Sequence, residues 1–172
     1  MNYATIKYND IANGLGVRTS LFVSGCSHKC KGCFNSETWD YNYGAPFDDK
    51  VIDDILKSLE NEYVDGLSLL GGEPMDKENQ EGILPLLRRF KSQFKDKDVW
   101  CYTGYLFEDL LAGGKAHFAH TDEILSYIDV LVDGRFVLEQ KNISLKFKGS
   151  ENQRIIDVKK SILKGEVVLF DV

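Results

Sequence analysis

Short apolar runs alternate along this chain with stretches that have the periodicity of amphipathic helices. The apolar runs cover residues 17–23, 66–70, 98–103 and 129–133. Helical spacing follows Asp48, a suitable cap for a helix carrying Ile52, Ile55, Leu56 and Leu59, and recurs over 83–94, 106–111 and 122–127. Because parallel strands need crossover connections, this alternation predicts an α/β fold with parallel strands.

The pattern is less regular in two places. Pro85 is compatible with the helix over 83–94 if it lies in the first turn, where its missing N–H is not needed. After Gly134, residues 143–147, 155–158 and 166–170 have the composition of extended segments, but nothing in the sequence orders them.

Unusual motifs follow the carboxyl ends of the predicted strands. They are a cysteine-rich loop after 17–23, Gly71-Gly72-Glu73-Pro74 after 66–70, Thr103-Gly104 and Asp133-Gly134. Parallel α/β folds gather their active sites at this edge, so one cleft can contain all four motifs. A complete eight-stranded barrel takes about 250 residues, whereas this chain has 172. We therefore expect an incomplete, open parallel (β/α) barrel, with residues 1–172 forming a single domain.

The composition of the chain limits which partners it can bind and in which cellular compartment it can work. The net charge of −6 argues against general binding to nucleic acid phosphates. We find neither an apolar run of the roughly 20 residues that span a bilayer nor a secretory signal, so we expect a cytoplasmic protein without membrane contact. Thiols stay reduced in the cytoplasm, and the cysteines are therefore better interpreted as metal ligands than as disulfides.

Cys26, Cys30 and Cys33 form a Cys-x3-Cys-x2-Cys motif that supplies three thiolates and no fourth nearby. An iron–sulfur cluster with one open iron fits this spacing, and Lys29 and Lys31 can offset its negative charge. A zinc site completed by His28 or Cys101 is an alternative, as is a buried helical stripe of small side chains. Cys101 lies within a predicted strand and is most simply a core thiol.

The motif extends to Gly14-x-Gly16-x-Arg18-x3-Phe22-x2-Gly25-Cys26-x3-Cys30-x2-Cys33-x-Asn35. It resembles the signature of glycyl-radical-enzyme activating enzymes in the radical S-adenosylmethionine superfamily. Gly71, Gly72 and Glu73 resemble the superfamily motif that binds the methionyl ammonium group. The resemblance implies an open barrel of the radical S-adenosylmethionine type, a [4Fe-4S] cluster on the three cysteines, and S-adenosylmethionine as cofactor.

Further matches resemble the branch that activates anaerobic ribonucleotide reductase. They are Cys30-Lys-Gly-Cys33-Phe-Asn35, residues 102–105, 129–136 and 149–154. By this resemblance Thr103 and Asp133 face the cofactor, and Phe34 replaces the aromatic residue usually found at position 32 as a candidate for adenine stacking. The partners implied are anaerobic ribonucleoside-triphosphate reductase, which receives a glycyl radical, and flavodoxin or a similar electron donor.

Three other functions stay open from the sequence. The chain could activate a different glycyl-radical enzyme, such as pyruvate formate-lyase. It could be a non-enzymatic iron–sulfur electron carrier, although such carriers normally fill every iron site with cysteine. A zinc-stabilised binding module is the third possibility.

Overall fold

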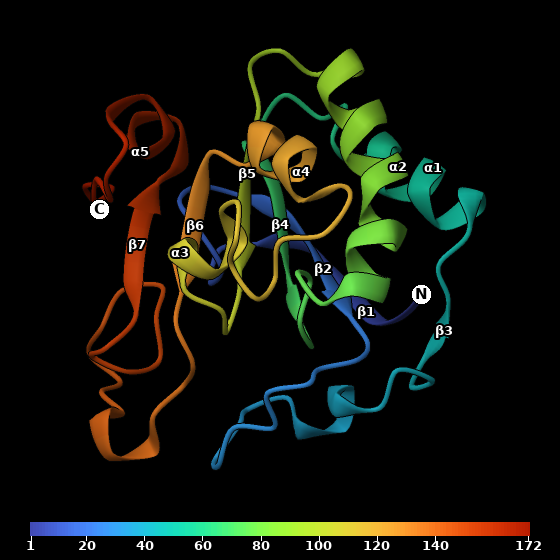
Figure 1. Ribbon diagram of the computed structural model, residues 1–172. Coiled ribbons are helices and arrows are strands. Elements are labelled where there is room, and N and C mark those ends of the chain that lie inside the picture. Colours follow the sequence, from blue (N-terminus) through green and yellow to red (C-terminus); the bar gives the residue numbers. More distant parts are fainter.

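Seven strands form one open sheet in the computed structural model, which describes residues 1–172 (Figure 1). The strands are β1 (Asn2–Asp10), β2 (Arg18–Val23), β3 (Ala45–Pro46), β4 (Gly66–Gly71), β5 (Asp98–Tyr102), β6 (Val130–Asp133) and β7 (Arg154–Asp157). Their order across the sheet is β3-β1-β2-β4-β5-β6-β7. The central β2, β4, β5 and β6 are parallel, as predicted, and together they form an open sheet consistent with a partial barrel.

The edges of the sheet differ from the expected parallel pattern. β1 pairs antiparallel with both β2 and β3, and β7 pairs antiparallel with β6. Residues 143–147 do not form a strand, and of 166–170 only Leu169 makes an isolated bridge, to Ile156. The expectation of extended structure is thus correct only for 155–158, most of which lies in β7.

Helices connect the parallel strands and cover one side of the sheet (Figure 1). They are α1 (Asp49–Ser58), α2 (Lys77–Gln93), α3 (Phe107–Leu110), α4 (Thr121–Tyr127) and α5 (Val158–Lys164), with short 3-10 helices at η1 (Ser36–Trp39) and η2 (Leu138–Gln140). The Asp48 carboxylate accepts a hydrogen bond from the backbone N–H of Val51, so the predicted cap of α1 is confirmed.

The expectation that Pro85 lies in the first turn of its helix is wrong. Helix α2 begins at Lys77, directly after the turn that contains Glu73, and Pro85 therefore lies in its interior. An interior proline removes one backbone hydrogen bond and costs about 3 kcal/mol. The helix nevertheless continues because Ile83, Leu87 and Phe90 are all fully buried against the sheet.

Alternating side chains of the strands divide the interior into two clusters. In β5, Val99 and Cys101 join the large core under the helices, whereas Trp100 points to the opposite face. There the Trp100 ring packs edge-on against Phe147 and Phe170. Helices therefore cover one face of the sheet, while the C-terminal third of the chain covers part of the other.

Two residues of the extended cysteine motif support the sheet. Arg18 is fully buried and donates hydrogen bonds to Ser68 in β4 and to Asp98 in β5, at 2.7 and 2.6 Å. Gly14 has a φ of +127°, and a Cβ at this position would lie 2.7 Å from the Arg18 side chain. Both residues thus serve the alignment of β2, β4 and β5.

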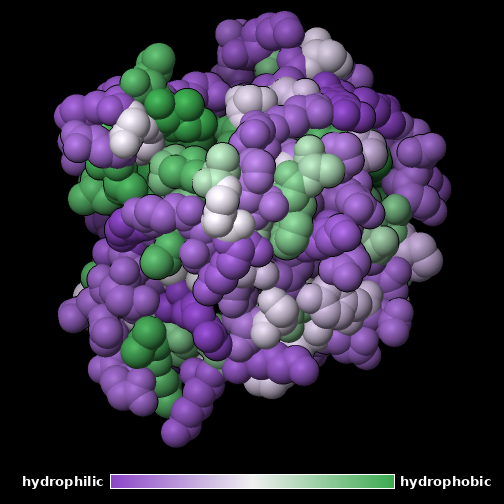
Figure 2. All heavy atoms as spheres, viewed as in Figure 1, coloured by the Kyte–Doolittle hydropathy of each residue, from purple (hydrophilic) through white to green (hydrophobic).

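The surface is largely polar, with apolar side chains gathered beside α5 at the upper left of Figure 2. Ile162 and Leu163 are 51% and 89% exposed, and Leu169 adds to them. No helix combines the length and the hydrophobicity that a membrane span requires.

Candidate active site

A cavity of about 620 Å³ lies where the parallel strands end. Its wall contains all but one of the residues selected from the sequence: Cys26, Cys30, Cys33, Phe34, Gly71, Gly72, Glu73 and Thr103. These residues follow β2, β4 and β5, and Gly134 after β6 joins them. The fold thus brings separate motifs to one site, as the position of strand ends in a parallel sheet predicts.

The cysteine loop leaves β2 through a backbone anchor. The Gly25 N–H donates to the carbonyl of Thr38 at 2.7 Å, and the Cys26 N–H donates to that of Trp39 at 3.2 Å. A tight turn joins the other two cysteines, since the Cys33 N–H donates to the Cys30 carbonyl at 3.1 Å. All three thiols are half-buried and line the cavity.

The two glycines before Glu73 allow the neighbouring loop to touch this anchor. Gly71 has a φ of +105°, a conformation that favours glycine. A Cβ on Gly72 would lie 2.4 Å from the Gly25 carbonyl oxygen. The Glu73 N–H donates to that same oxygen at 2.7 Å. Backbone of the turn therefore packs directly on backbone leading to Cys26, with no room for side chains between them.

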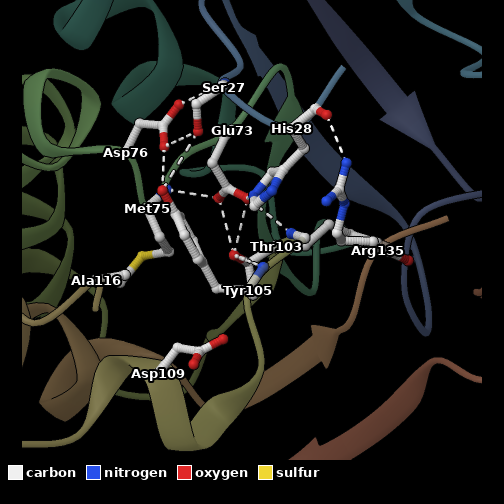
Figure 3. Close-up of polar contacts among 12 residues, drawn as sticks. Ser27, His28, Glu73, Met75, Asp76, Thr103, Tyr105, Asp109, Ala116 and Arg135 are labelled. Carbon is white, nitrogen blue, oxygen red and sulfur yellow. Dashed lines mark hydrogen bonds and ion pairs between the residues drawn. The ribbon is translucent and has the colours of Figure 1, made fainter. Parts of the chain in front are cut away.

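The Glu73 carboxylate is 1% exposed and gathers hydrogen bonds from three loops (Figure 3). It accepts from the Gly104 N–H at 2.7 Å, from the Thr103 hydroxyl at 2.9 and 3.0 Å, and from the Met75 N–H at 2.8 Å. His28 Nε2 lies 2.7 Å from Oε1 and, because a carboxylate only accepts, carries the shared proton. Thr103 thus faces the cavity while holding Glu73 in place.

Asp133 is the predicted site residue that does not line the cavity. Its carboxylate is fully buried and accepts hydrogen bonds from the Phe107 N–H at 2.7 Å and from the Arg154 guanidinium at 2.6 and 3.0 Å. Its neighbours Val132 and Gly134 do line the cavity. Alternation along β6 turns the Asp133 side chain toward Arg154 instead.

Phe34 lies at the cavity with a 64% exposed side chain. Its ring centroid is 5.1 Å from that of Phe136, and the Lys141 Nζ lies 5.2 Å from it. An aromatic ring this exposed offers apolar surface to a planar ligand. Adenine stacking on Phe34 stays a prediction.

The residues present fit an iron–sulfur cluster and a polar cofactor. Burial raises the pKa of the Cys26 thiol to about 11, so this thiol releases a proton when it becomes a metal ligand. Two buried polar atoms in the cavity wall, Tyr102 Oη and Trp39 Nε1, have no hydrogen-bond partner in the chain and are free to bind a ligand.

The other metal-binding candidates occupy different surroundings. Cys101 is fully buried in the core under the helices, as predicted, and burial raises the pKa of its thiol. The His28 imidazole is engaged by Glu73 and packs against the Tyr105 ring at a centroid distance of 4.5 Å. No group of three His, Cys, Asp or Glu side chains is arranged around a position for a single metal ion.

Comparison with known proteins gives concordant matches. The family model described as 4Fe-4S single cluster domain matches residues 12–156. Anaerobic ribonucleoside-triphosphate reductase-activating proteins of Haemophilus influenzae, Escherichia coli K12 and Enterobacteria phage T4 are 42%, 41% and 40% identical to this chain. The alignments cover 89–90% of this chain and 97%, 96% and 93% of those proteins, respectively. The chain belongs to this family of reductase-activating proteins.

Membership in the activating-protein family confirms the resemblance seen in the sequence. It also confirms the predicted cofactors of the family, a [4Fe-4S] cluster and S-adenosylmethionine. The structure adds residues that sequence reasoning did not select. They are Lys7, Trp39 and most of segment 141–148 in the cavity wall, together with Asp76 behind the cysteine loop. Tyr102, from a segment matched in the sequence but not selected as a site residue, also lines the cavity. Asp76 stands three residues after Glu73, so proximity to that motif was the available signal.

Proposed function

We propose that this chain activates anaerobic ribonucleoside-triphosphate reductase and that Cys26, Cys30 and Cys33 hold its [4Fe-4S] cluster. Three half-buried thiols share one cavity with Glu73 and the strand-end loops, and this arrangement carries the proposal. When bound and reduced, the cluster would supply the one electron that cleaves S-adenosylmethionine to methionine and the 5′-deoxyadenosyl radical, which takes a hydrogen atom from a glycine of the reductase to give 5′-deoxyadenosine and a glycyl radical.

The residues around the thiols have separate tasks in this proposal. Glu73 presents negative charge to the methionyl ammonium group, and the glycines before it bring backbone close to the ligand. Phe34 offers its exposed ring to the adenine. The two unpartnered atoms, Tyr102 Oη and Trp39 Nε1, are available to the polar groups of the cofactor. The protein thereby holds the reacting groups close and limits access of water.

Asp133 acts in this proposal through the loop that it supports. Its carboxylate accepts hydrogen bonds from the Phe107 N–H and from the Arg154 guanidinium. It thereby joins two parts of the chain to β6: the segment after β5, and strand β7 itself. The adjacent Gly134 then lies in the cavity wall. This arrangement supports an indirect contribution of Asp133 to cofactor binding.

We propose that residues 1–172 act as a single domain in the cytoplasm and receive electrons from flavodoxin or a similar donor. The open sheet supports entry of a glycine-bearing loop of the reductase, because abstraction requires the two carbon atoms to approach to about 3–3.5 Å. A protein substrate reaches that distance only through an accessible cleft and a flexible loop.

The decisive experiment mixes the reduced protein, S-adenosylmethionine and anaerobic ribonucleoside-triphosphate reductase without oxygen. We expect a glycyl radical by electron paramagnetic resonance, and deuterium in 5′-deoxyadenosine when the target glycine carries deuterium. Pyruvate formate-lyase serves as the control partner and should stay radical-free. Absence of a radical on the reductase, with an intact cluster, would exclude the proposed function; a radical without deuterium transfer would exclude direct abstraction.

A further inference from the structure

Asp76 lies directly behind the cysteine loop and is 4% exposed. Its Oδ2 accepts hydrogen bonds from the Ser27 N–H at 2.9 Å and from the Tyr41 hydroxyl at 2.6 Å. Its Oδ1 accepts from the Ser27 hydroxyl at 2.8 Å and from the Tyr105 hydroxyl at 2.6 Å. Each carboxylate oxygen therefore has two donors, and Ser27 supplies one to each oxygen. Figure 3 shows Asp76 with Ser27 and Tyr105.

None of these four donors is a cation. A buried carboxylate without a charged partner is costly unless hydrogen bonds compensate for the lost hydration, and charge-assisted hydrogen bonds do so best. Burial and the hydrogen bond to Asp76 raise the pKa of both Tyr41 and Tyr105, so each hydroxyl keeps its proton and donates at neutral pH. The Asp76 carboxylate is thus stabilised by the four neutral donors around it.

Ser27 stands between the first two cysteines, where the loop is held from several directions. The next residue, His28, contacts Glu73 through its imidazole, and its carbonyl accepts a hydrogen bond from Arg135 at 2.6 Å. Gly104 packs so closely on the imidazole that a Cβ would lie 2.5 Å from it. Loops after β4, β5 and β6 therefore converge on Ser27 and His28, next to Cys26.

We propose that Asp76 is a positioning residue that holds the cysteine loop, through Ser27, in the conformation that binds the iron–sulfur cluster. This inference rests on the proposed ligand role of Cys26, Cys30 and Cys33. Asp76 makes no hydrogen bond to any of the three cysteines and does not line the cavity. Ser27, the neighbour of Cys26, binds both carboxylate oxygens, and we assign the effect of Asp76 to this contact.

The test compares the parent protein with Asp76→Asn after anaerobic cluster reconstitution. An asparagine keeps the size of the side chain but directs an N–H₂ group at one pair of donors. We expect an altered paramagnetic resonance spectrum of the reduced cluster and faster release of iron to a chelator. Removing a residue that orients a metal ligand usually lowers metal affinity about 10- to 100-fold, and we expect an acceleration of the same order.

Two control variants separate positioning from general damage. Glu123→Gln removes a carboxylate that also has three side-chain donors, two from Arg88 and one from Tyr127, but lies on α4 away from the cavity. Ile55→Ala lowers stability in the core at α1 without touching the loop. Both should release iron at the parent rate. If iron release accelerates equally in Ile55→Ala and Asp76→Asn, the effect of Asp76 is explained by lower overall stability, and the proposal is overturned.

The path through Ser27 has its own test. Ser27→Ala removes the hydroxyl donor and keeps the N–H, so a smaller acceleration is expected. In the double variant the two accelerations should combine to less than their product, because both changes break the same contact. If the double variant releases iron faster by the full product of the two single accelerations, the effect of Asp76 runs through Tyr41 and Tyr105, and the route through Ser27 is wrong. If the parent itself binds no cluster through the three cysteines, the proposed function fails. If the parent binds the cluster and Asp76→Asn releases iron at the parent rate, the proposed function stands and the positioning role of Asp76 fails.

Discussion

The Nε2 atom of His28 lies 2.7 Å from Oε1 of Glu73, so the cysteine loop and the glycine-rich turn share a buried polar contact. Glu73 therefore has two roles that substitutions can separate. It is the predicted ligand of the methionyl ammonium group, and it is also the partner of the His28 imidazole, which belongs to the loop of the predicted cluster ligands.

Glu73→Gln should weaken S-adenosylmethionine binding while the cluster stays in place. Loss of a charge-assisted hydrogen bond costs about 1.5–3 kcal/mol, or roughly 10- to 150-fold in affinity. Titration of the reconstituted variant measures this. His28→Ala is the matched control because it leaves the carboxylate intact, and its affinity should fall less. Equal losses in both variants would mean that Glu73 acts on the cofactor only through the loop.

Single Cys→Ala changes at 26, 30 and 33 should each reduce bound iron and sulfide well below the roughly four of each expected for a [4Fe-4S] cluster. Cys101→Ala is the control, because that thiol is buried in the core under the helices. It should keep its cluster after anaerobic reconstitution. Full iron retention in any loop variant, or iron loss from folded Cys101→Ala, would contradict the ligand assignment.

Arg154→Ala should lower the free energy of unfolding by about 3 kcal/mol, because it leaves the buried carboxylate of Asp133 without its cation. The Asp133 side chain is 0% exposed and that of Arg154 is 30% exposed. Arg88→Ala breaks a surface pair with Glu123 and should lower the free energy of unfolding much less, because solvent screens an exposed pair. Urea unfolding of the metal-free proteins measures both. Similar costs for the two variants would show that the Asp133 pair is no stronger than a surface pair.

The pair between Arg88 and Glu123 should make stability depend on acid pH. Hydrogen bonds from Arg88 and Tyr127 lower the pKa of Glu123 to about 2 from its ordinary value of 4.5. The contribution of ionised Glu123 to the free energy of unfolding is therefore complete above about pH 4.5 and is lost as the pH falls toward 2. Thermal unfolding of the metal-free protein across this range should show a smaller decline for Glu123→Gln than for the parent. Parallel curves would indicate that the pair does not contribute.

The central strands and the residues of the cavity could be predicted because several signals agree there. Each apolar strand ends in a polar or glycine-rich motif, and parallel strands bring those ends together. β1 was missed because its residues are mostly exposed or half-buried and show no clean alternation. α5 was missed for a related reason: its apolar Ile162 and Leu163 point to the surface, so the sequence lacks a regular buried stripe.

Individual side-chain directions were harder to predict than the location of the site. Asp133 follows an apolar run just as Glu73 does, yet it is the last residue of β6 and faces away from the cavity. Glu73 comes after the end of β4, in a turn where strand alternation no longer applies. Position relative to the last paired residue of a strand therefore decides which acidic residue reaches the cavity.

The convergence of three loops on Ser27 and His28 also restricts how this protein can evolve. Tyr105 after β5 packs on the His28 ring, Asp76 after β4 binds Ser27, and Arg135 after β6 binds the His28 carbonyl. A substitution in one loop changes the surroundings of the others, so neutral drift at these positions must occur in compensating sets. Grafting the cysteine loop alone onto another α/β scaffold would therefore transfer the three cysteines without the framework that holds their loop.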